Sequence, residues 1–253
     1  MGTYAMTGGA TGIGAAIKKN LLDAGNKVIV VDIKDADIVA DLSTRDGRQA
    51  AISAIRDAAG DGLDGFVACA GLGSHVPNHP LIAKVNYFGT TELVAGVKDL
   101  LASKKGAVIL ISSNSAPMET SQEYVNLLLE DDEEKACQAA EGIEGQMVYS
   151  GSKQAVARWM RRNTAEYAAV GVRMNAVAPG YTETPMTEQV ANDPTYGDAI
   201  KAFVKSIPIG RAGVPEDMAK AVNFLLSPDA SFVCGSVLFV DGGHDAMMRA
   251  DQF

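Results

Sequence analysis

The sequence has 253 residues, of which 47% are hydrophobic, and it carries 22 basic against 31 acidic side chains, a formal net charge of −9. This charge argues against nucleic acids and anionic membranes as partners, and the length fits one α/β domain over residues 1–253. Because we find neither a long apolar run nor a basic segment followed by one, the sequence predicts no membrane span, no secretory signal and a cytoplasmic location.

The first informative feature is a glycine-rich turn between a strand-like run at residues 3–7 and a helical pattern at residues 15–22. It reads Thr7-Gly8-Gly9-Ala10-Thr11-Gly12-Ile13-Gly14. Glycines at such a point permit positive φ and bring the backbone close to a pyrophosphate, whose charge the amides at the helix start stabilise. Taken alone, this pattern is more often a turn that only reverses the chain.

The next strand strengthens the case for a dinucleotide. The apolar run at residues 27–31 ends in Asp32, eighteen residues after Gly14 (32−14), where a ribose-binding acid belongs. A carboxylate accepts hydrogen bonds from ribose hydroxyls and repels a 2′-phosphate, so Asp32 favours NAD over NADP. Two alternatives stay open: Asp32 caps the next turn, or Lys34 reduces the repulsion of a phosphate.

Further strand-like runs at residues 65–70, 107–112, 172–178 and 236–240 alternate with helical patterns. They predict a Rossmann-type, doubly wound parallel sheet in a single α/β domain. Ligands of such sheets bind beyond the carboxyl ends of the strands, which here are followed by Gly71, Ser113 and Gly180.

A helical pattern between the strand-like runs at residues 107–112 and 172–178 carries Tyr149 and Lys153, which are four positions apart and therefore on one helical face. An ammonium beside a phenol lowers the pKa of the phenol, which could then exchange a proton with a substrate oxygen. The bare pair more often marks a solvated helix face. Ser112 and Ser113 at the preceding strand end are candidates for a third group, and strand alternation sends them to opposite sides. The resemblance described next favours Ser113, which is the second serine of the Ile-Ser-Ser run, and Ser115 is the fallback.

These residues, taken in order, resemble the short-chain dehydrogenase/reductase family over nearly the whole chain. The resemblance depends on the glycine turn and on motifs at residues 41–42, 69–71, 86–89, 111–113, 149–153, 179–184 and 240–243. One departure is Cys69, where the family usually has an asparagine of mainly structural role. Cys69, Cys137 and Cys234 are too scattered for a disulfide framework or a zinc site, so we expect small, reduced core residues.

The resemblance implies a role for each matched residue. Tyr149 is the base in alcohol oxidation and the acid in ketone reduction, Ser113 binds the reacting oxygen, and Lys153 holds the nicotinamide ribose. Asn86 supports a water relay to Lys153, completing the catalytic set Asn86, Ser113, Tyr149 and Lys153. The expected NAD-binding residues are Gly8, Thr11, Gly12, Ile13, Gly14, Asp32, Asp41, Leu42, Gly71, Tyr149, Lys153, Thr182 and Thr184.

Two variable segments are expected to shape the substrate site. Residues 117–145 form a helical insertion before Tyr149, which could wall the substrate pocket, alter the usual subunit contact, or do both. Residues 181–209 are expected to cover bound substrate. With Ser113, the residues Met118, Pro185 and Met186 would contact a hydrophobic ketone or alcohol, although each methionine could equally be core packing.

Four stretches that are not general family motifs, at residues 32–44, 69–73, 85–89 and 248–253, resemble a bacterial branch that acts on hydroxysteroids and carbonyl compounds. The alternatives are another hydrophobic alcohol, such as a terpenoid, an aromatic carbinol or a diol, and a nonenzymatic NAD-binding sensor. By resemblance a homodimer or homotetramer is expected. No catalytic metal is expected, because Pro77 between His75 and His79 makes a shared helical face unlikely.

Overall fold

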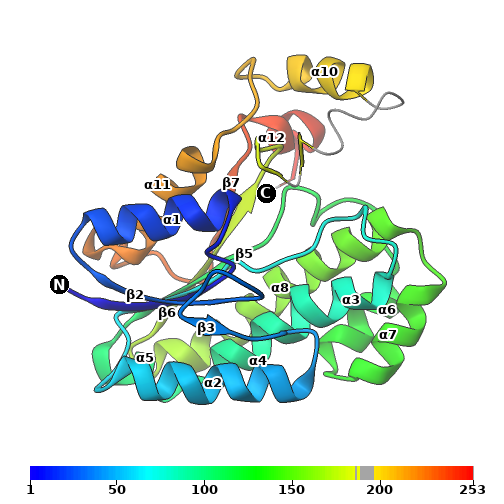
Figure 1. Ribbon diagram of the computed structural model, residues 1–253. Coiled ribbons are helices and arrows are strands. Elements are labelled where there is room, and N and C mark those ends of the chain that lie inside the picture. Colours follow the sequence, from blue (N-terminus) through cyan, green and yellow to red (C-terminus); the bar gives the residue numbers. More distant parts are fainter. Residues whose placement is uncertain (186, 189–196, 253) are drawn as a thin grey trace.

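The computed structural model describes residues 1–185, 187–188 and 197–252. Within these residues, seven strands form one parallel sheet in the order β3-β2-β1-β4-β5-β6-β7 (Figure 1). The strands are β1 (Thr3–Thr7), β2 (Lys27–Asp32), β3 (Ile38–Val39), β4 (Gly65–Ala68), β5 (Ala107–Ile111), β6 (Arg173–Pro179) and β7 (Val237–Val240). The predicted Rossmann-type sheet is therefore confirmed.

The strand β3 is the part of the sheet that the sequence did not predict. It has two residues, with Ile38 paired to Val31 and Val39 paired to Asp32. A run this short lies in a polar loop and shows no periodicity, so only its pairing with β2 defines it as a strand.

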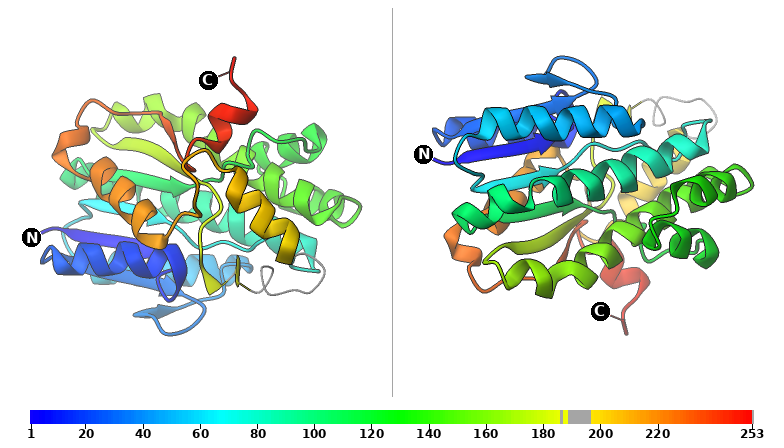
Figure 2. Two further views of the ribbon diagram at one scale, coloured as in Figure 1. Left: turned by 90° about the horizontal axis from the view of Figure 1, so that it is seen from above. Right: turned by 90° about the horizontal axis from the view of Figure 1, so that it is seen from below.

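Helices cover both faces of the sheet (Figure 2). One face carries α1 (Gly12–Asp23) and α11 (Pro215–Leu226), and the other carries α2 (Arg45–Ala59), α4 (Gly89–Gly96), α5 (Lys98–Lys104) and α8 (Gly145–Ala168). The remaining described helices are α3 (His79–Ala83), the π-helix η1 (Lys84–Phe88), α6 (Gln122–Leu129), α7 (Glu133–Glu141), α10 (Gly197–Ser206), the 3-10 helix η2 (Pro228–Ala230) and α12 (His244–Met248). None of the helices in the described part of the chain combines the length and apolar character that crossing a bilayer requires.

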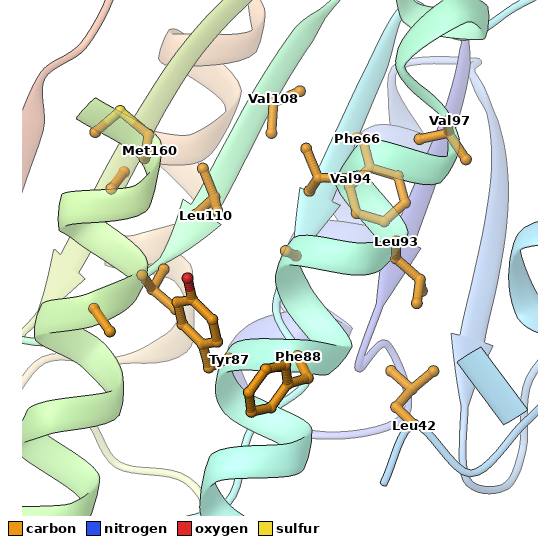
Figure 3. Close-up of a cluster of buried hydrophobic side chains, with 14 of the residues drawn as sticks. Leu42, Phe66, Tyr87, Phe88, Leu93, Val94, Val97, Val108, Leu110 and Met160 are labelled. Atoms are coloured by element: carbon orange, nitrogen blue, oxygen red, sulfur yellow. The ribbon is translucent and has the colours of Figure 1, made fainter. Parts of the chain in front are cut away.

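Alternation along the strands divides the buried side chains into two cores, one on each face of the sheet. In β5, Val108 and Leu110 belong to the core under α4 and α8, whereas Ile109 belongs to the core under α1 and α11. Figure 3 shows the first core, in which the ring of Tyr87 points toward Leu110 and meets the ring of Phe88 edge to face. Burial on both faces explains why the strands are continuous apolar runs rather than alternating ones.

A buried arginine joins α7 to the main body of the domain. The side chain of Arg48, in α2, is 0% exposed, and its Nη2 lies 2.6 Å from Oε2 of Glu133 in α7. Its Nε lies 2.9 Å from Oε2 of Glu92 in α4, and its Nη1 donates to the Leu42 carbonyl at 3.3 Å. The segment before Tyr149 is therefore tied electrostatically to the helices beneath the sheet.

Replacing Arg48 with Met should lower the free energy of unfolding by about 2–4 kcal/mol, because the carboxylates of Glu92 and Glu133 would lose their buried partner. The control is Arg56→Met, also in α2, whose ion pair with Asp99 is largely solvated, so its loss should change stability far less. Urea unfolding of both variants measures the difference. Equal losses would contradict a structural role for the buried arginine.

Candidate active site

A cavity of about 800 Å³ opens at the carboxyl ends of the parallel strands. Its walls include nearly all the site residues that the sequence predicted, namely Gly8, Thr11, Gly12, Ile13, Gly14, Asp32, Asp41, Leu42, Gly71, Ser113, Met118, Tyr149, Lys153, Thr182, Thr184 and Pro185. Asn86 is not on the wall, and Met186 lies outside the described residues. Part of the range 181–209 also lies outside them, while Tyr181, Thr187, Ile200 and Phe203 from it line the cavity.

The glycine turn brings bare backbone to the cavity. Gly8 has φ +75°, and a Cβ placed there would lie 2.6 Å from the backbone N of Ala70. Thr7 fixes this approach, because its Oγ1 accepts from the N–H groups of Cys69 and Ala70, each at 3.1 Å. The helix α1 starts at Gly12 without a side-chain cap, so the turn presents helix-start amides where an anionic group could bind.

Asp32 stands at the end of β2 on the cavity wall. Its Oδ2 accepts from the N–H of Ala10 at 2.9 Å, and its Oδ1 accepts from the N–H of Ile33 at 2.7 Å. The carboxylate therefore braces the glycine turn while facing the cavity, so the turn-capping and ligand-binding interpretations of Asp32 are compatible. The carboxylate retains acceptor capacity for ribose hydroxyls.

The neighbouring wall at Asp41 and Leu42 is built by a local turn. Oδ1 of Asp41 accepts from the N–H of Ser43 at 2.9 Å, and the hydrogen bonds with Ser43 hold the pKa of Asp41 below its ordinary value. Leu42 is buried and contributes an apolar surface. The carboxylate of Asp41 thus stabilises the local turn, and the side chain of Leu42 forms an apolar part of the cavity wall.

The two serines at the end of β5 have separate partners. Ser112 Oγ donates to the Lys153 carbonyl at 2.9 Å and so packs against α8. Ser113 Oγ accepts from the N–H of Ser115 at 3.1 Å and from Ser115 Oγ at 2.9 Å. Ser113 also forms a hydrogen bond with the Tyr149 side chain. The fallback residue Ser115 therefore supports Ser113 rather than replacing it.

The expected fall in the pKa of Tyr149 is not found. Burial raises the pKa of the Tyr149 phenol, and the hydrogen bond with Ser113 opposes that rise. The Lys153 ammonium is 5.8 Å from the centroid of the Tyr149 ring, and its Nζ donates instead to the Ile111 carbonyl at 2.9 Å. Burial therefore outweighs the hydrogen bond with Ser113, a balance that the spacing of Tyr149 and Lys153 in the chain could not reveal.

Lys153 is itself changed by its surroundings. The residue is 5% exposed, and burial lowers its pKa from 10.5 to about 8. With a pKa of about 8, the amine of Lys153 changes between its charged and neutral forms at mildly alkaline pH. It can therefore release and take up a proton under these conditions.

The depressed pKa of Lys153 leads to a stability prediction. Between pH 8 and 10.5 the unfolded chain binds more protons at this residue than the folded protein does, so the stability contribution rises with pH. Below pH 8 the buried charge costs about 3 kcal/mol at 1.36 kcal/mol per pKa unit. Lys153→Met should therefore exceed the parent in stability at pH 7, with an advantage that shrinks toward pH 10.5. Urea unfolding at several pH values tests this, and parallel curves would contradict it.

Asn86 lies behind the cavity in the π-helix η1. Its Oδ1 accepts from the N–H of Leu72 at 2.7 Å, and its Nδ2 donates to the Leu72 carbonyl at 3.1 Å and to Ser152 Oγ at 3.2 Å. Ser152 donates in turn to the Tyr149 carbonyl at 2.7 Å. The side chain of Asn86 thus joins the loop after β4 to the helix that carries Tyr149 and Lys153.

The helices within residues 117–145 pack beside the site. Thr120 Oγ1 donates to the Met147 carbonyl at 2.6 Å, and a Cβ at Gly151 would lie 2.9 Å from the Tyr124 ring. The helix α6 consequently rests on α8. Met118 lines the cavity and is 42% exposed, which identifies it as wall rather than core.

Comparisons with known proteins agree with this geometry. A family model described as short chain dehydrogenase matches residues 3–125, and one described as Enoyl-(Acyl carrier protein) reductase matches residues 135–245. The chain is 42% identical to the 3-alpha-hydroxysteroid dehydrogenase/carbonyl reductase of Comamonas testosteroni, with 100% of both sequences covered. It is 32% identical to the cis-4-hydroxycyclohexanecarboxylate dehydrogenase of Sinomonas cyclohexanicum over 96% of each.

A solved structure gives a similar result. The 3-alpha-hydroxysteroid dehydrogenase from Pseudomonas sp. B-0831, crystallised with NADH, superposes with a TM-score of 0.94 at 45% identity. The alignment covers 99% of this chain and 100% of that chain.

Proposed function

The chain belongs to the short-chain dehydrogenase/reductase family, and we propose that it interconverts a hydrophobic secondary alcohol of the hydroxysteroid class and its ketone, with NAD(H) as cofactor. The observation that carries the proposal is the convergence of Ser113, Tyr149 and Lys153 on one cavity with the glycine turn and Asp32. Hydroxysteroid-acting relatives supply the substrate class.

The residues present fit a dinucleotide. Gly8 and Gly14 have no room for a Cβ, because backbone of the domain itself packs against them, and this tight turn lines the cavity where α1 starts without a side-chain cap. The proposed contacts are the turn for the pyrophosphate, Asp32 for the adenosine ribose, Tyr149 and Lys153 for the nicotinamide ribose, and Thr182 and Thr184 for the carboxamide. When bound, the nicotinamide would donate or accept the hydride.

The chain itself would handle the proton. In ketone reduction the phenol of Tyr149 donates its proton to the carbonyl oxygen, and in oxidation the phenolate takes that proton from the alcohol. Ser113 Oγ hydrogen-bonds the same oxygen and orients it toward Tyr149. Burial keeps the phenol protonated at neutral pH, which suits reduction. Lys153 replaces the spent proton, with Asn86 fixing the loop beside it.

A spectrophotometric screen tests the proposal. Purified protein is offered ketosteroids, quinones and simple aryl ketones with NADH or NADPH, and the matching alcohols with NAD⁺ or NADP⁺. We expect the highest kcat/KM for a ketosteroid with NADH. Turnover confined to terpenoid, aromatic or diol substrates would show that the substrate is one of these alternative alcohols and not a hydroxysteroid. A preference for NADPH would contradict the proposed role of Asp32.

We also propose a cytoplasmic homodimer or homotetramer in which residues 117–145 take part in both the cavity wall and the subunit contact. Two substitutions on the exposed side of α6, Glu123→Lys, which reverses a charge, and Asn126→Lys, which adds one, leave the buried face of the helix intact. The mass of this variant in solution should fall if α6 lies in the contact. An unchanged mass would contradict that part of the proposal.

A further inference from the structure

A chain of contacts that the catalytic scheme does not use begins beside Ser113. The next residue, Asn114, donates its backbone N–H to the Pro179 carbonyl at 2.9 Å, which ties the end of β5 to the end of β6. Its side-chain Nδ2 donates to Nδ1 of His244 at 3.2 Å. His244 is the first residue of α12 and is 6% exposed. Because an amide nitrogen can only donate, Nδ1 of His244 is the acceptor of this hydrogen bond.

The His244 ring also contacts α10. Phe203, from α10, meets the imidazole edge to face with ring centroids 5.0 Å apart and an interplanar angle of 77°. Phe203 makes a second such contact with Tyr181, at 6.0 Å and 73°. Figure 1 shows α10 and α12 at the same end of the molecule. The rings of Phe203 and Tyr181 line the cavity, whereas His244 stands behind them.

We propose that His244 is a positioning residue with two separable effects on catalysis. Its ring holds Phe203, and through it the part of α10 that forms an apolar wall for a large substrate. Its Nδ1 holds Asn114, and through it the strand end that presents Ser113 to the substrate oxygen. The proposal depends on the function proposed above, because it concerns how well that substrate is bound and turned over.

Two substitutions separate the effects. His244→Gln keeps a polar acceptor for Asn114 and removes the ring, so KM for a ketosteroid should rise about 3- to 10-fold, the range of one aromatic contact, with kcat nearly unchanged. His244→Phe keeps the ring contact and removes the acceptor, so kcat should fall about 5-fold, the effect of one lost hydrogen bond, with KM nearly unchanged.

Three controls distinguish positioning from general damage. The KM for a small ketone and the Kd for NADH should be unchanged in both variants. Phe203→Ala should raise KM for the ketosteroid, and adding His244→Gln to it should raise KM no further, because both changes remove one contact. A KM that rises equally for small and large ketones, or effects that add fully, would overturn the proposal.

A measurement without substrate or cofactor separates this inference from the function it depends on. The chain has 3 histidines, so the ring resonances can be assigned by nuclear magnetic resonance with His75→Gln and His79→Gln. Phe203→Leu should change the chemical shifts of His244 and of neither other histidine. Asn114→Ala should change the chemical shift of Nδ1 of His244. Unmoved His244 signals in both variants would refute the contacts, whatever substrate the enzyme uses.

Discussion

Tyr149→Phe is expected to lower kcat by about 10²- to 10⁴-fold while weakening NADH binding by no more than about 10-fold, the effect of one lost hydrogen bond to the ribose. The phenol supplies the proton that the carbonyl oxygen needs, and phenylalanine keeps the ring that packs in the cavity wall. Stopped-flow or steady-state reduction of a ketosteroid measures the first effect, and quenching of NADH fluorescence measures the second.

The matched control for this substitution is Tyr124→Phe. Tyr124 is wholly buried in α6, and its hydroxyl has no hydrogen-bond partner among the described residues. Removing that hydroxyl should leave kcat unchanged and stability unchanged or improved, because a buried polar atom without a partner is lost. Equal kcat in the parent and Tyr149→Phe would point to another proton donor, whereas a parent that binds NADH without turning over any substrate would favour a nonenzymatic NAD-binding sensor.

The fold was largely predictable because its signals are local. A doubly wound sheet buries both faces of its strands, so residues 27–31 and 107–112 stand out as apolar runs in the chain. The start of α11 likewise has a local signal, the proline and two acids at Pro215, Glu216 and Asp217. In the structure, Oδ2 of Asp217 accepts from the N–H of Val214 at 2.9 Å. The two-residue strand β3 has no such signal, since its identity depends on a neighbour.

The cavity-lining residues were predictable for a topological reason. Parallel strands end at the same edge, so residues that follow separate strands, such as Gly8, Gly71 and Ser113, meet there although they are far apart in the chain. What could not be predicted depends on burial. The raised pKa of Tyr149 and the contacts of Arg48 follow from packing between distant elements.

His244 shows the same limit at the level of a single side chain. Its only sequence signal is a position after two glycines, which indicates a turn and says nothing of Asn114 or Phe203. The hydrogen bond to Asn114 spans 130 positions of the chain. Contacts of this kind arise from how α10 and α12 meet the end of the sheet, so no local pattern predicts them.

Gly14→Ala should weaken NADH binding on the order of 10- to 100-fold, about 1.4–2.8 kcal/mol, and destabilise the protein by about 1–3 kcal/mol or more. Gly14 lies in the first turn of α1, and a Cβ there would be 1.6 Å from the Gly8 carbonyl oxygen, itself part of the rigid turn. The turn would have to open, displacing the amides proposed to bind the pyrophosphate. Thermal unfolding and fluorescence titration measure the two effects.

The sign of this result is decisive, because helix propensity alone predicts the opposite. Alanine is favoured over glycine within a helix by about 1 kcal/mol, so without the clash Gly14→Ala would stabilise α1.

Gly142, which follows α7, provides the control, since a Cβ there would meet only the Ala139 carbonyl oxygen, at 3.8 Å. Gly142→Ala should therefore stabilise the protein by about 0.4–1 kcal/mol. If Gly14→Ala does not fold, Gly12→Ala still tests the turn, because its Cβ would meet a flexible side chain, that of Thr184 at 3.3 Å, and the φ of +55° at Gly12 would strain the alanine. Normal NADH affinity in both turn variants would mean that the glycines serve packing and not the cofactor.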